Sequence, residues 1–542
     1  MKTFYPKLFE VMKDYKKGQL ISDVIAGIIV AIIALPLSVA LAIASGVSPE
    51  KGLYTAIVAG FVISLFGGSR VNISGPTAAF ATIVAGIVAQ FGTSGLVIAT
   101  IMAGIILIVM GFCKVGGLIK YIPETITTGF TSGIAVTILI GQLKDLFGVT
   151  YPQGANPIET IEKIEVFIKS VSTINYQSLI VGIISILILA LWPKVSKKIP
   201  GSLIVVILGI AAVKLFDIEV NTIGDLYTVS SNLPAPAFPE VDWQLIKALI
   251  PSAFTIAILA GIESLLSCVV SDGMINDKHN SNTELIAQGI GNVFSGIFGG
   301  IPATGAIART AANVKNGGRT PIAGIVHAIV LLLILVVLMP YAAWIPMPVI
   351  AAILIMVAYN MCHMHQFIYI CKSAPKSDIA VLVLTFVLTV VFDLVVAIEV
   401  GIIVTMVLFM KRMGDVTEVR AWDDGADDES LKDIPKDTRV FEINGPMFFA
   451  TAEMVSEISP DEHIKVVVVR MRNIPMLDIS ALISLKKIHK TLTKRGIRVL
   501  YSHVNEQPMS VMKKSGFYDV AGEENFLPSI DESLELARSI TE

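Results

Sequence analysis

The chain has 542 residues, of which 54% are hydrophobic and 16% charged, and its formal net charge is −3. Because ordinary soluble proteins have about 25% charged residues, this composition excludes a simple soluble domain. The near-neutral charge says little about partners, and no basic patch suited to nucleic acid is present. Charge is scarce from about residue 20 to 410 and returns afterwards, which predicts a membrane part followed by a soluble part.

The sequence lacks the motifs of several other functions. Its 4 cysteines lie far apart without a CxxC pair, so neither a disulfide framework nor a zinc site is predicted. No nucleophilic triad appears, and the absence of a phosphate-binding glycine loop argues against an ATP-driven pump in this chain. We therefore predict no enzyme activity, no metal and no cofactor.

The N-terminal segment, residues 1–20, lacks the apolar core and the cleavage site of a signal peptide. We expect a polar cytoplasmic segment there. Apolar stretches follow, and about 20 apolar residues are needed to cross a bilayer. The stretches that reach or approach this length are 24–45, 96–112, 179–192, 203–216, 322–339 and 379–392. Shorter stretches, or stretches broken by Gly and Pro, are 53–66, 74–88, 250–267, 285–298 and 303–312.

Short segments at membrane depth are typical of half-helices that line a cavity. We expect about fourteen segments in all. Lys and Arg precede the first segment and follow the even-numbered ones, for example at Lys114, Lys315 and Lys411. By the positive-inside rule, both termini are cytoplasmic. The acidic, Pro-rich segment 217–243 is then external.

A short pattern occurs once in each half of the membrane part. Phe-Gly-Gly at 66–68 precedes SRVNISGPTAAFA (69–81), and Phe-Gly-Gly at 298–300 precedes IPATGAIARTAAN (301–313). In both places an apolar segment ends, a Gly/Pro/Thr break follows, and a short helix of small residues begins. The recurrence predicts inverted repeats.

The two breaks, 74–77 and 302–306, are candidate anion sites. The first turn of a helix has backbone N–H groups without partners and the positive end of the helix dipole. Two such ends facing each other inside the membrane would bind an anion with few charged side chains. The alternative is that both breaks are ordinary loop turns.

Three further side chains have candidate roles. Glu263 lies within an apolar span, where a carboxylate is costly and functional by default. Burial disfavours its charged form, which suits proton coupling; alternatively, it is tied to a neighbouring helix end or to Arg309. Arg309 follows the second break and either offers charge to the substrate or extends toward the membrane surface. Pro36 either bends the first span around the site or makes a plain kink.

The tail after residue 436 alternates predicted strands and helices, which implies a small mixed or parallel sheet covered by helices. Residues 413–436 are rich in Asp and predict an acidic, solvated linker. The predicted elements, in order, are strands at 438–444 and 465–471, a helix at 481–493, a strand at 498–502 and a helix at 508–515.

Six stretches together resemble the sulfate permease family, called SulP in bacteria and solute carrier 26 in animals. They are ASGVSPEKGLYTAIVAGF (44–61), LFGGSRVNISGPTAAF (65–80), GIESLLSCVVSDGM (261–274), HNSNTELIAQGIGNVFSGIFGG (279–300), IPATGAIARTAANVKNGGRTPIAG (301–324) and GPMFFATAEM (445–454). The resemblance implies an α-helical membrane protein with two inverted seven-segment repeats, arranged as core and gate domains. It also implies a small cytoplasmic α/β STAS domain at the C-terminus and a homodimer.

The resemblance also implies roles for individual residues. The substrate is expected between the starts of the third and tenth segments, and the coupling ion on the eighth. The implied substrate-binding residues are Pro36, Thr77, Ala78, Ala79, Gly305, Ala306, Ile307 and Arg309, and the implied coupling residues are Glu263 and Ser267. In the STAS part, Ser480 matches the phosphorylated Ser of anti-sigma-factor antagonists; the alternative is an unmodified turn residue.

One departure from the family bears on the coupling ion. Sodium-dependent bicarbonate members look hydroxyl-bearing where Ile307 stands, and an Ile side chain offers no oxygen to sodium. This favours protons. Three short stretches are most similar to the branch assigned to C4-dicarboxylates.

We therefore expect a proton-coupled, elevator-type secondary transporter of sulfate or a C4-dicarboxylate, with bicarbonate as a further candidate, in the lipid bilayer of the cell (inner) membrane. The alternatives are an anion channel or uncoupled exchanger, and a STAS-linked membrane signalling protein. The expected domains are a cytoplasmic segment (1–20), membrane repeat 1 (21–216), an external linker (217–243), membrane repeat 2 (244–412), an acidic linker (413–436) and the STAS domain (437–542).

Overall fold

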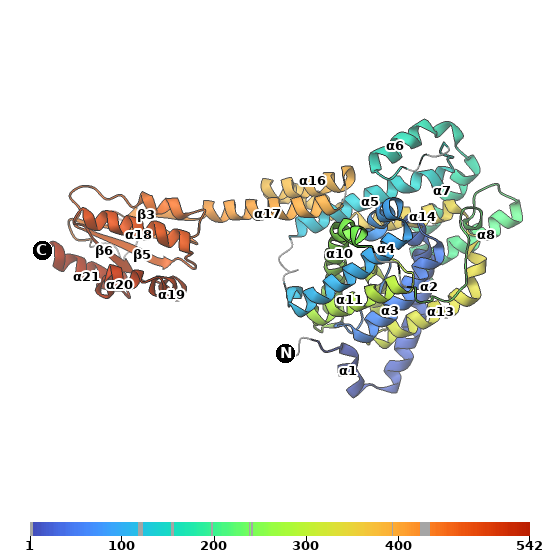
Figure 1. Cartoon of the computed structure of the whole chain (residues 1–542), viewed down its shortest axis with the longest axis horizontal. Helices are drawn as coiled ribbons and strands as arrows, with labels where there is room; N and C mark the ends of the chain where they lie inside the picture. The colour runs from blue at the N-terminus through green and yellow to red at the C-terminus, as the bar shows by residue number, and fades with distance from the viewer. Residues whose placement is uncertain are drawn as a thin grey trace. The chain divides into compact units, whose positions relative to one another are not determined.

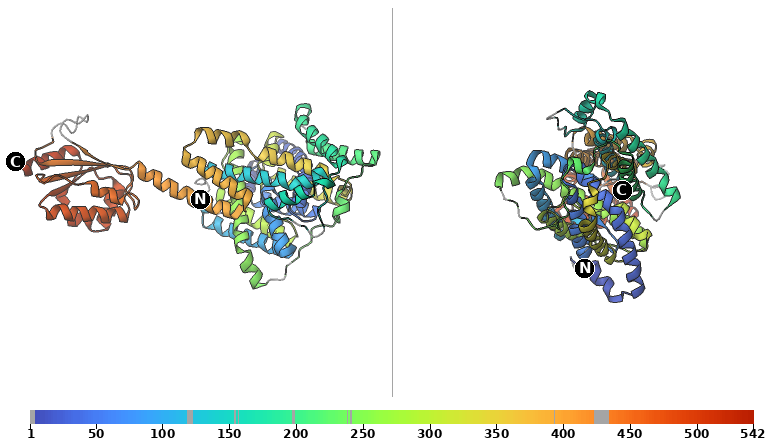
Figure 2. Two further views of the ribbon diagram at one scale, coloured as in Figure 1. Left: turned by 90° about the horizontal axis from the view of Figure 1, so that it is seen from above. Right: turned by 90° about the vertical axis from the view of Figure 1, so that its right-hand side faces the viewer.

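The computed structural model describes residues 4–117, 123–152, 155, 157–196, 199–237, 239, 242–392, 394–422 and 434–542. It divides into two compact units, Met1–Ile402 and Ile403–Glu542. The first unit is a bundle of helices, and the second is a sheet covered by helices (Figure 1, Figure 2). Residues 423–433, which hold most of the charged residues of the predicted acidic linker, lie outside the described residues.

The helical unit contains both long apolar helices and short ones. Those of the first half are α1 (Lys7–Val11), α2 (Lys17–Ala44), α3 (Pro49–Phe66), α4 (Ala81–Phe112), α5 (Glu124–Phe147), α6 (Thr160–Lys169), α7 (Tyr176–Val195) and α8 (Gly201–Phe216). Those of the second half are α9 (Ile223–Leu226), α10 (Trp243–Ile275), α11 (Ser281–Ile297), α12 (Ile307–Lys315), α13 (Ile322–Ala342), α14 (Met347–Met361), α15 (Met364–Ser373), α16 (Lys376–Val391) and α17 (Leu394–Asp415).

Within the described residues, 8 helical stretches are long and apolar enough to cross a membrane, and α8 is a shorter apolar helix. The predicted class, a helical membrane protein with a small C-terminal α/β domain, is confirmed. α5 is not among the apolar stretches predicted above. It is less hydrophobic than α13, because Thr, Ser and Gly are interspersed among its apolar residues.

α4 is divided at Gly92, whose φ of 69° lies in the left-handed region that glycine adopts without strain. Residues before Gly92 form the half-helix that follows the first break. Residues after it form the span predicted at 96–112. The helix therefore contains two of the predicted membrane segments.

Small residues let α4 and α11 pack closely. A Cβ at Gly104 would lie 2.6 Å from the carbonyl oxygen of Gly289, and a Cβ at Gly289 would lie 2.5 Å from that of Gly104. Backbones approach so closely only where side chains are absent. The contact holds α11 firmly against the first half of the unit.

The C-terminal unit contains a five-stranded sheet with the order β3-β4-β5-β6-β7. β3 is antiparallel to β4, and the other neighbours are parallel, so the predicted mixed sheet is present. Consecutive residues of β5, such as Val467 and Val468, lie in separate cores on the two faces. The elements are β3 (Glu418–Trp422), β4 (Thr438–Asn444), β5 (Val466–Asn473), α18 (Ile479–Lys494), β6 (Arg498–Ser502), α19 (Glu506–Lys514), α20 (Phe517–Ala521), β7 (Phe526–Leu527) and α21 (Ile530–Thr541).

The prediction of a solvated linker over residues 413–436 is wrong in its first part. α17 extends to Asp415, and Glu418–Trp422 form the edge strand β3. The side chain of Trp422 is 8% exposed, and its Nε1 donates to the carboxylate of Glu442 at 3.1 Å. The acidic residues after Trp422 dominate the local composition and conceal this strand.

Candidate functional site

The two sequence breaks lie side by side. They form two-residue strands, β1 (Ser74–Gly75) and β2 (Thr304–Gly305), which pair antiparallel with Ser74 opposite Gly305. The N–H of Ala306 donates to the carbonyl of Ile73 at 2.8 Å. The two breaks are therefore held together although they lie more than 200 residues apart in sequence. Ile73 and Thr310, which share a hydrogen bond across them, are 237 residues apart.

Each strand leads directly into the start of a helix. Thr77 precedes the 3₁₀ turn η2 (Ala78–Phe80), which continues into α4, and Ala306 precedes α12. Neither start has a hydrogen bond from a capping side chain. The first-turn N–H groups and the positive dipole ends are thus available to an anion.

Arg309, in the first turn of α12, crosses to the first break. It is 3% exposed, and its Nη2 donates to the carbonyl of Pro76 at 2.8 Å. Its Nη1 is buried and has no hydrogen-bond partner among the described residues. A Cβ at Gly75 would lie 2.5 Å from this Nη1. One guanidinium group therefore links the breaks and keeps a donor free.

Glu263 joins the same place from α10. It is partly exposed, and its carboxylate accepts a 2.9 Å hydrogen bond from the hydroxyl of Thr77. Within the described residues, no ion pair joins Glu263 to Arg309, so the partner of Glu263 is the start of a neighbouring helix. Ser267, one turn further along α10, is buried and donates to Asn72 at 2.7 Å. Its hydrogen bonds go to the polar core behind the breaks.

The remaining predicted residues differ in their surroundings. Ala78 and Ala79 are buried in the η2 turn, and Ile307 is 41% exposed at the start of α12. Pro36 is buried within α2. Ser480 lies in the other unit, in the first turn of α18, where Asp478 caps the helix by accepting from the N–H of Ala481.

Sequence reasoning missed a second group of functional candidates. Asn72, Glu284 and Gln288 form a buried polar cluster behind the breaks. Glu284 and Gln288 are four residues apart on α11, where the sequence analysis named the apolar stretch 285–298 and the family stretch 279–300 but neither side chain. Glu284 follows the polar run 279–283 and directly precedes the apolar stretch 285–298, so the criterion applied to Glu263, a carboxylate within an apolar segment, does not select it.

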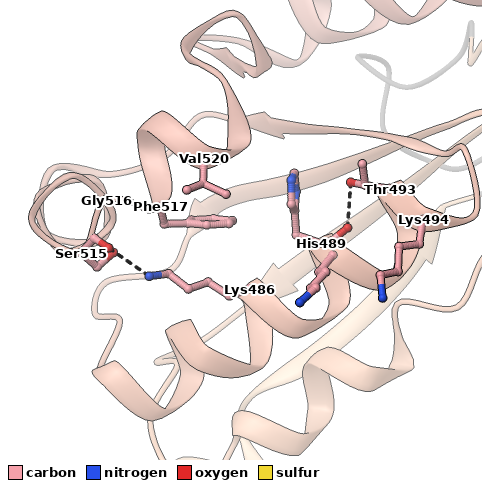
Figure 3. Close-up of a pocket in the computed structure, with 9 residues that line it drawn as sticks. Lys486, His489, Thr493, Lys494, Ser515, Gly516, Phe517 and Val520 are labelled. Atoms are coloured by element: carbon pink, nitrogen blue, oxygen red, sulfur yellow. Dashed lines mark hydrogen bonds between the residues drawn. The ribbon is translucent and has the colours of Figure 1, made fainter.

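The C-terminal unit has a cavity of about 560 Å³ between α18 and the α19–α20 turn (Figure 3). Phe517 packs edge-on against His489, with ring centroids 5.4 Å apart. Lys486 Nζ donates to the carbonyl of Ser515 at 3.0 Å. Burial lowers the pKa of His489, whose Nδ1 lies 3.0 Å from the hydroxyl of Tyr501. The lining includes two further lysines, Lys490 and Lys494.

These helices and the C-terminal sheet define a multi-pass membrane transporter with a STAS-type domain. The chain belongs to the sulfate permease family, whose model matches residues 20–385. The STAS domain model matches residues 430–533.

Named relatives and solved structures agree with this membership. A candidate sulfate transporter, YvdB of Bacillus subtilis, is 37% identical over 96% of this chain and 98% of its own length. The bicarbonate transporter BicA of Picosynechococcus is 32% identical over 80% of each chain. The transmembrane domain of a cyanobacterial BicA covers 71% of this chain and 98% of its own, with a TM-score of 0.64 and 30% identity.

The whole chain also has the fold of the murine Solute Carrier 26 anion transporter A9 in its inward-facing state. The TM-score is 0.89 at 19% identity, covering 98% of this chain and 94% of that one. YvdB and BicA are named for sulfate and bicarbonate. Neither name supports the predicted C4-dicarboxylate branch.

Proposed function

We propose that this protein transports an oxyanion, sulfate or bicarbonate, held between the start of η2–α4 and the start of α12. The observation that carries the proposal is the antiparallel pairing of β1 with β2. This pairing sets two uncapped helix starts against each other. The free Nη1 of Arg309 adds a fixed positive charge beside them, and the names of the relatives supply the anions.

Coupling to protons is the second part of the proposal, with Glu263 as the group that exchanges the proton. Its carboxylate is partly exposed and contacts Thr77 at one helix start. An anion bound there would be repelled by the charged carboxylate and accepted more readily once that group is protonated. Ile307 offers no oxygen ligand at the other helix start, which disfavours sodium.

The remaining parts concern movement and location. The breaks are bonded to α10, α11 and α12, so we propose that this core moves as one body in an elevator-type cycle. Lys and Arg positions support a cell-membrane location with both termini and the STAS domain cytoplasmic. The family resemblance supports a homodimer.

The test is uptake into liposomes that contain the purified protein. Labelled sulfate, bicarbonate and succinate are offered under an inward proton gradient, an inward sodium gradient or neither. We expect saturable uptake of sulfate or bicarbonate that rises several-fold with the proton gradient. Uptake driven by sodium alone would reject proton coupling. Single-channel currents in the same protein would show that it is a channel and not a carrier. No uptake of any of the three would reject transport of these anions.

A further inference from the structure

A buried carboxylate lies behind the two breaks and takes no part in the proposed anion or proton site. Glu284, near the start of α11, is 0% exposed. Within the described residues, no Lys, Arg or His forms an ion pair with it. An isolated buried charge is costly, so its surroundings must compensate by hydrogen bonding.

Glu284 accepts hydrogen bonds from four donors. The backbone N–H of Gly68 donates to Oε2 at 2.9 Å. Asn72 Nδ2, Ser264 Oγ and Gln288 Nε2 donate to Oε1 at 2.8, 3.0 and 3.0 Å. A backbone N–H and an amide NH₂ can only donate, so each of these neighbours needs an acceptor oxygen at this position. Glu263, by contrast, accepts a hydrogen bond from one donor among the described residues, the hydroxyl of Thr77.

The cluster reaches both breaks through Asn72. While its amide nitrogen donates to Glu284, its Oδ1 accepts from Ser267 at 2.7 Å and from Thr310 at 3.0 Å. The hydroxyl oxygen of Thr310 also accepts the N–H of Ile73 at 3.0 Å. Asn72 therefore connects α10 and α12 to the residue that precedes β1, in an orientation that the carboxylate of Glu284 imposes.

Two further contacts tighten this arrangement. Gln288 Nε2 donates to the hydroxyl of Ser74, in β1, at 2.9 Å. A Cβ at Gly305, in β2, would lie 2.6 Å from Asn72 Nδ2, so the side chain of Asn72 lies directly against the second strand. One carboxylate thus sets the position of both strands that lead into the helix starts.

We propose that Glu284 is a positioning residue for anion binding: it orients Asn72, and through Asn72 and Gln288 it sets the register of the two half-helix starts. The inference rests on the proposed function, because its effect is measured on the affinity for the transported anion. Glu284 exchanges no proton in this scheme. Its loss should weaken anion binding and leave the pH dependence of uptake unchanged.

The experiment exchanges the donor and the acceptor of the hydrogen bond between Asn72 and Glu284. Glu284→Gln puts an amide opposite the amide of Asn72, and Asn72→Asp puts a carboxylate opposite that of Glu284. Each single variant should raise the KM for sulfate or bicarbonate about tenfold or more, since a buried polar group loses its partner. In Glu284→Gln/Asn72→Asp, the amide donates to the carboxylate and the net charge is that of the parent. We expect its KM to return to within a few-fold of the parent value.

The readouts separate positioning from simple destabilisation. A structural role alone would lower the amount of folded protein and the maximal rate, without the KM change and without recovery in the double variant. Thr310→Val keeps the side-chain shape but removes the hydroxyl that links Asn72 to Ile73 and also accepts from Ser267 at 3.1 Å. It serves if the Glu284 variants do not fold. It should raise KM in the same direction.

The outcomes also separate this inference from the proposed function. If the parent protein takes up neither anion, the proposed function fails. If the parent transports but Glu284→Gln or Thr310→Val has the parent KM, the positioning role alone is rejected. A changed pH profile in folded Glu284→Gln would instead assign proton exchange to Glu284 and overturn the inference.

Discussion

The hydroxyl of Thr77 donates a 2.9 Å hydrogen bond to the carboxylate of Glu263 across 186 residues of sequence. Thr77 is the last residue before the first half-helix start, and Glu263 lies in the middle of α10. A change in the charge of Glu263 is therefore felt at the helix start itself. This contact gives the proposed coupling between proton and anion a direct physical route.

Replacing Glu263 tests that route. Glu263→Gln keeps the size of the side chain and an oxygen that can accept from Thr77, but it cannot exchange a proton. We expect anion uptake to persist and its acceleration by an inward proton gradient to disappear. Glu50→Gln, which changes another poorly exposed carboxylate, on α3, is the matched control and should keep the full acceleration. Proton-driven uptake by Glu263→Gln would show that another group carries the proton.

Arg309 is expected to determine anion affinity. Arg309→Gln removes the charge that faces the helix starts, and loss of a charge-assisted hydrogen bond predicts a KM about 10- to 100-fold higher. The KM of Arg309→Lys should lie between those of Arg309→Gln and the parent. The guanidinium group of Arg can donate to Pro76 and to the anion at once, whereas the single ammonium group of Lys cannot reach both. Arg70→Gln removes a partly exposed arginine paired with Asp277 and should leave KM unchanged. If Arg309→Gln and Arg309→Lys have the same KM as Arg70→Gln and the parent, Arg309 is excluded from the site.

Gly75 should be intolerant of any side chain. In Gly75→Ala the new methyl group would lie 2.5 Å from Arg309 Nη1, so either the arginine or strand β1 must move. We expect at least a tenfold rise in KM for the anion, measured as initial uptake, by the same loss of a buried polar contact. Gly86→Ala, in α4, has nothing within 4 Å of the added carbon. It should retain parental affinity and gain up to about 1 kcal/mol of helix stability.

The stability of the C-terminal unit should fall in mild acid because of His489. Burial lowers the pKa of this imidazole below its ordinary value, so the folded unit prefers the neutral ring. The stabilisation is present above the unfolded pKa of about 6.5 and is lost as pH falls through the folded value. Hydrogen exchange in α18 and β6 of the full-length protein, followed from pH 7.5 to 5, should slow less than intrinsic exchange slows, so that the protection of these amides falls.

The control for this pH effect is a second histidine. His489→Asn should remove most of the acid-dependent change, whereas His463→Gln, at an exposed position, should leave it intact. The same pH dependence in His489→Asn would mean that another group of the unit titrates.

The C-terminal unit illustrates how far local pattern reaches. Strands predicted at 438–444 and 498–502 coincide with β4 and β6, because their apolar runs are short, rich in Val and Leu, and bounded by polar turns. β3 was missed because an edge strand buries few of its residues and leaves little periodicity to detect. Its one buried large side chain, Trp422, becomes meaningful only beside Glu442.

The sequence by itself determined the class of protein and the two broken segments, and it singled out Glu263 and Arg309 as candidate site residues. Apolar length, Gly/Pro breaks and charges within apolar spans report the bilayer environment directly, since each follows from the cost of placing polar groups in lipid. These are properties of short stretches, so they can be recognised without knowing what lies beside them.

Only the tertiary structure decided which groups meet. Glu263 and Glu284 are both carboxylates on helices of the membrane part, yet one meets Thr77 and the other meets four donors, including Gly68 from 216 residues away. The free-energy cost of a buried carboxylate depends on the number and direction of its hydrogen-bond donors. Those donors come from other helices, and no pattern within a single segment records them.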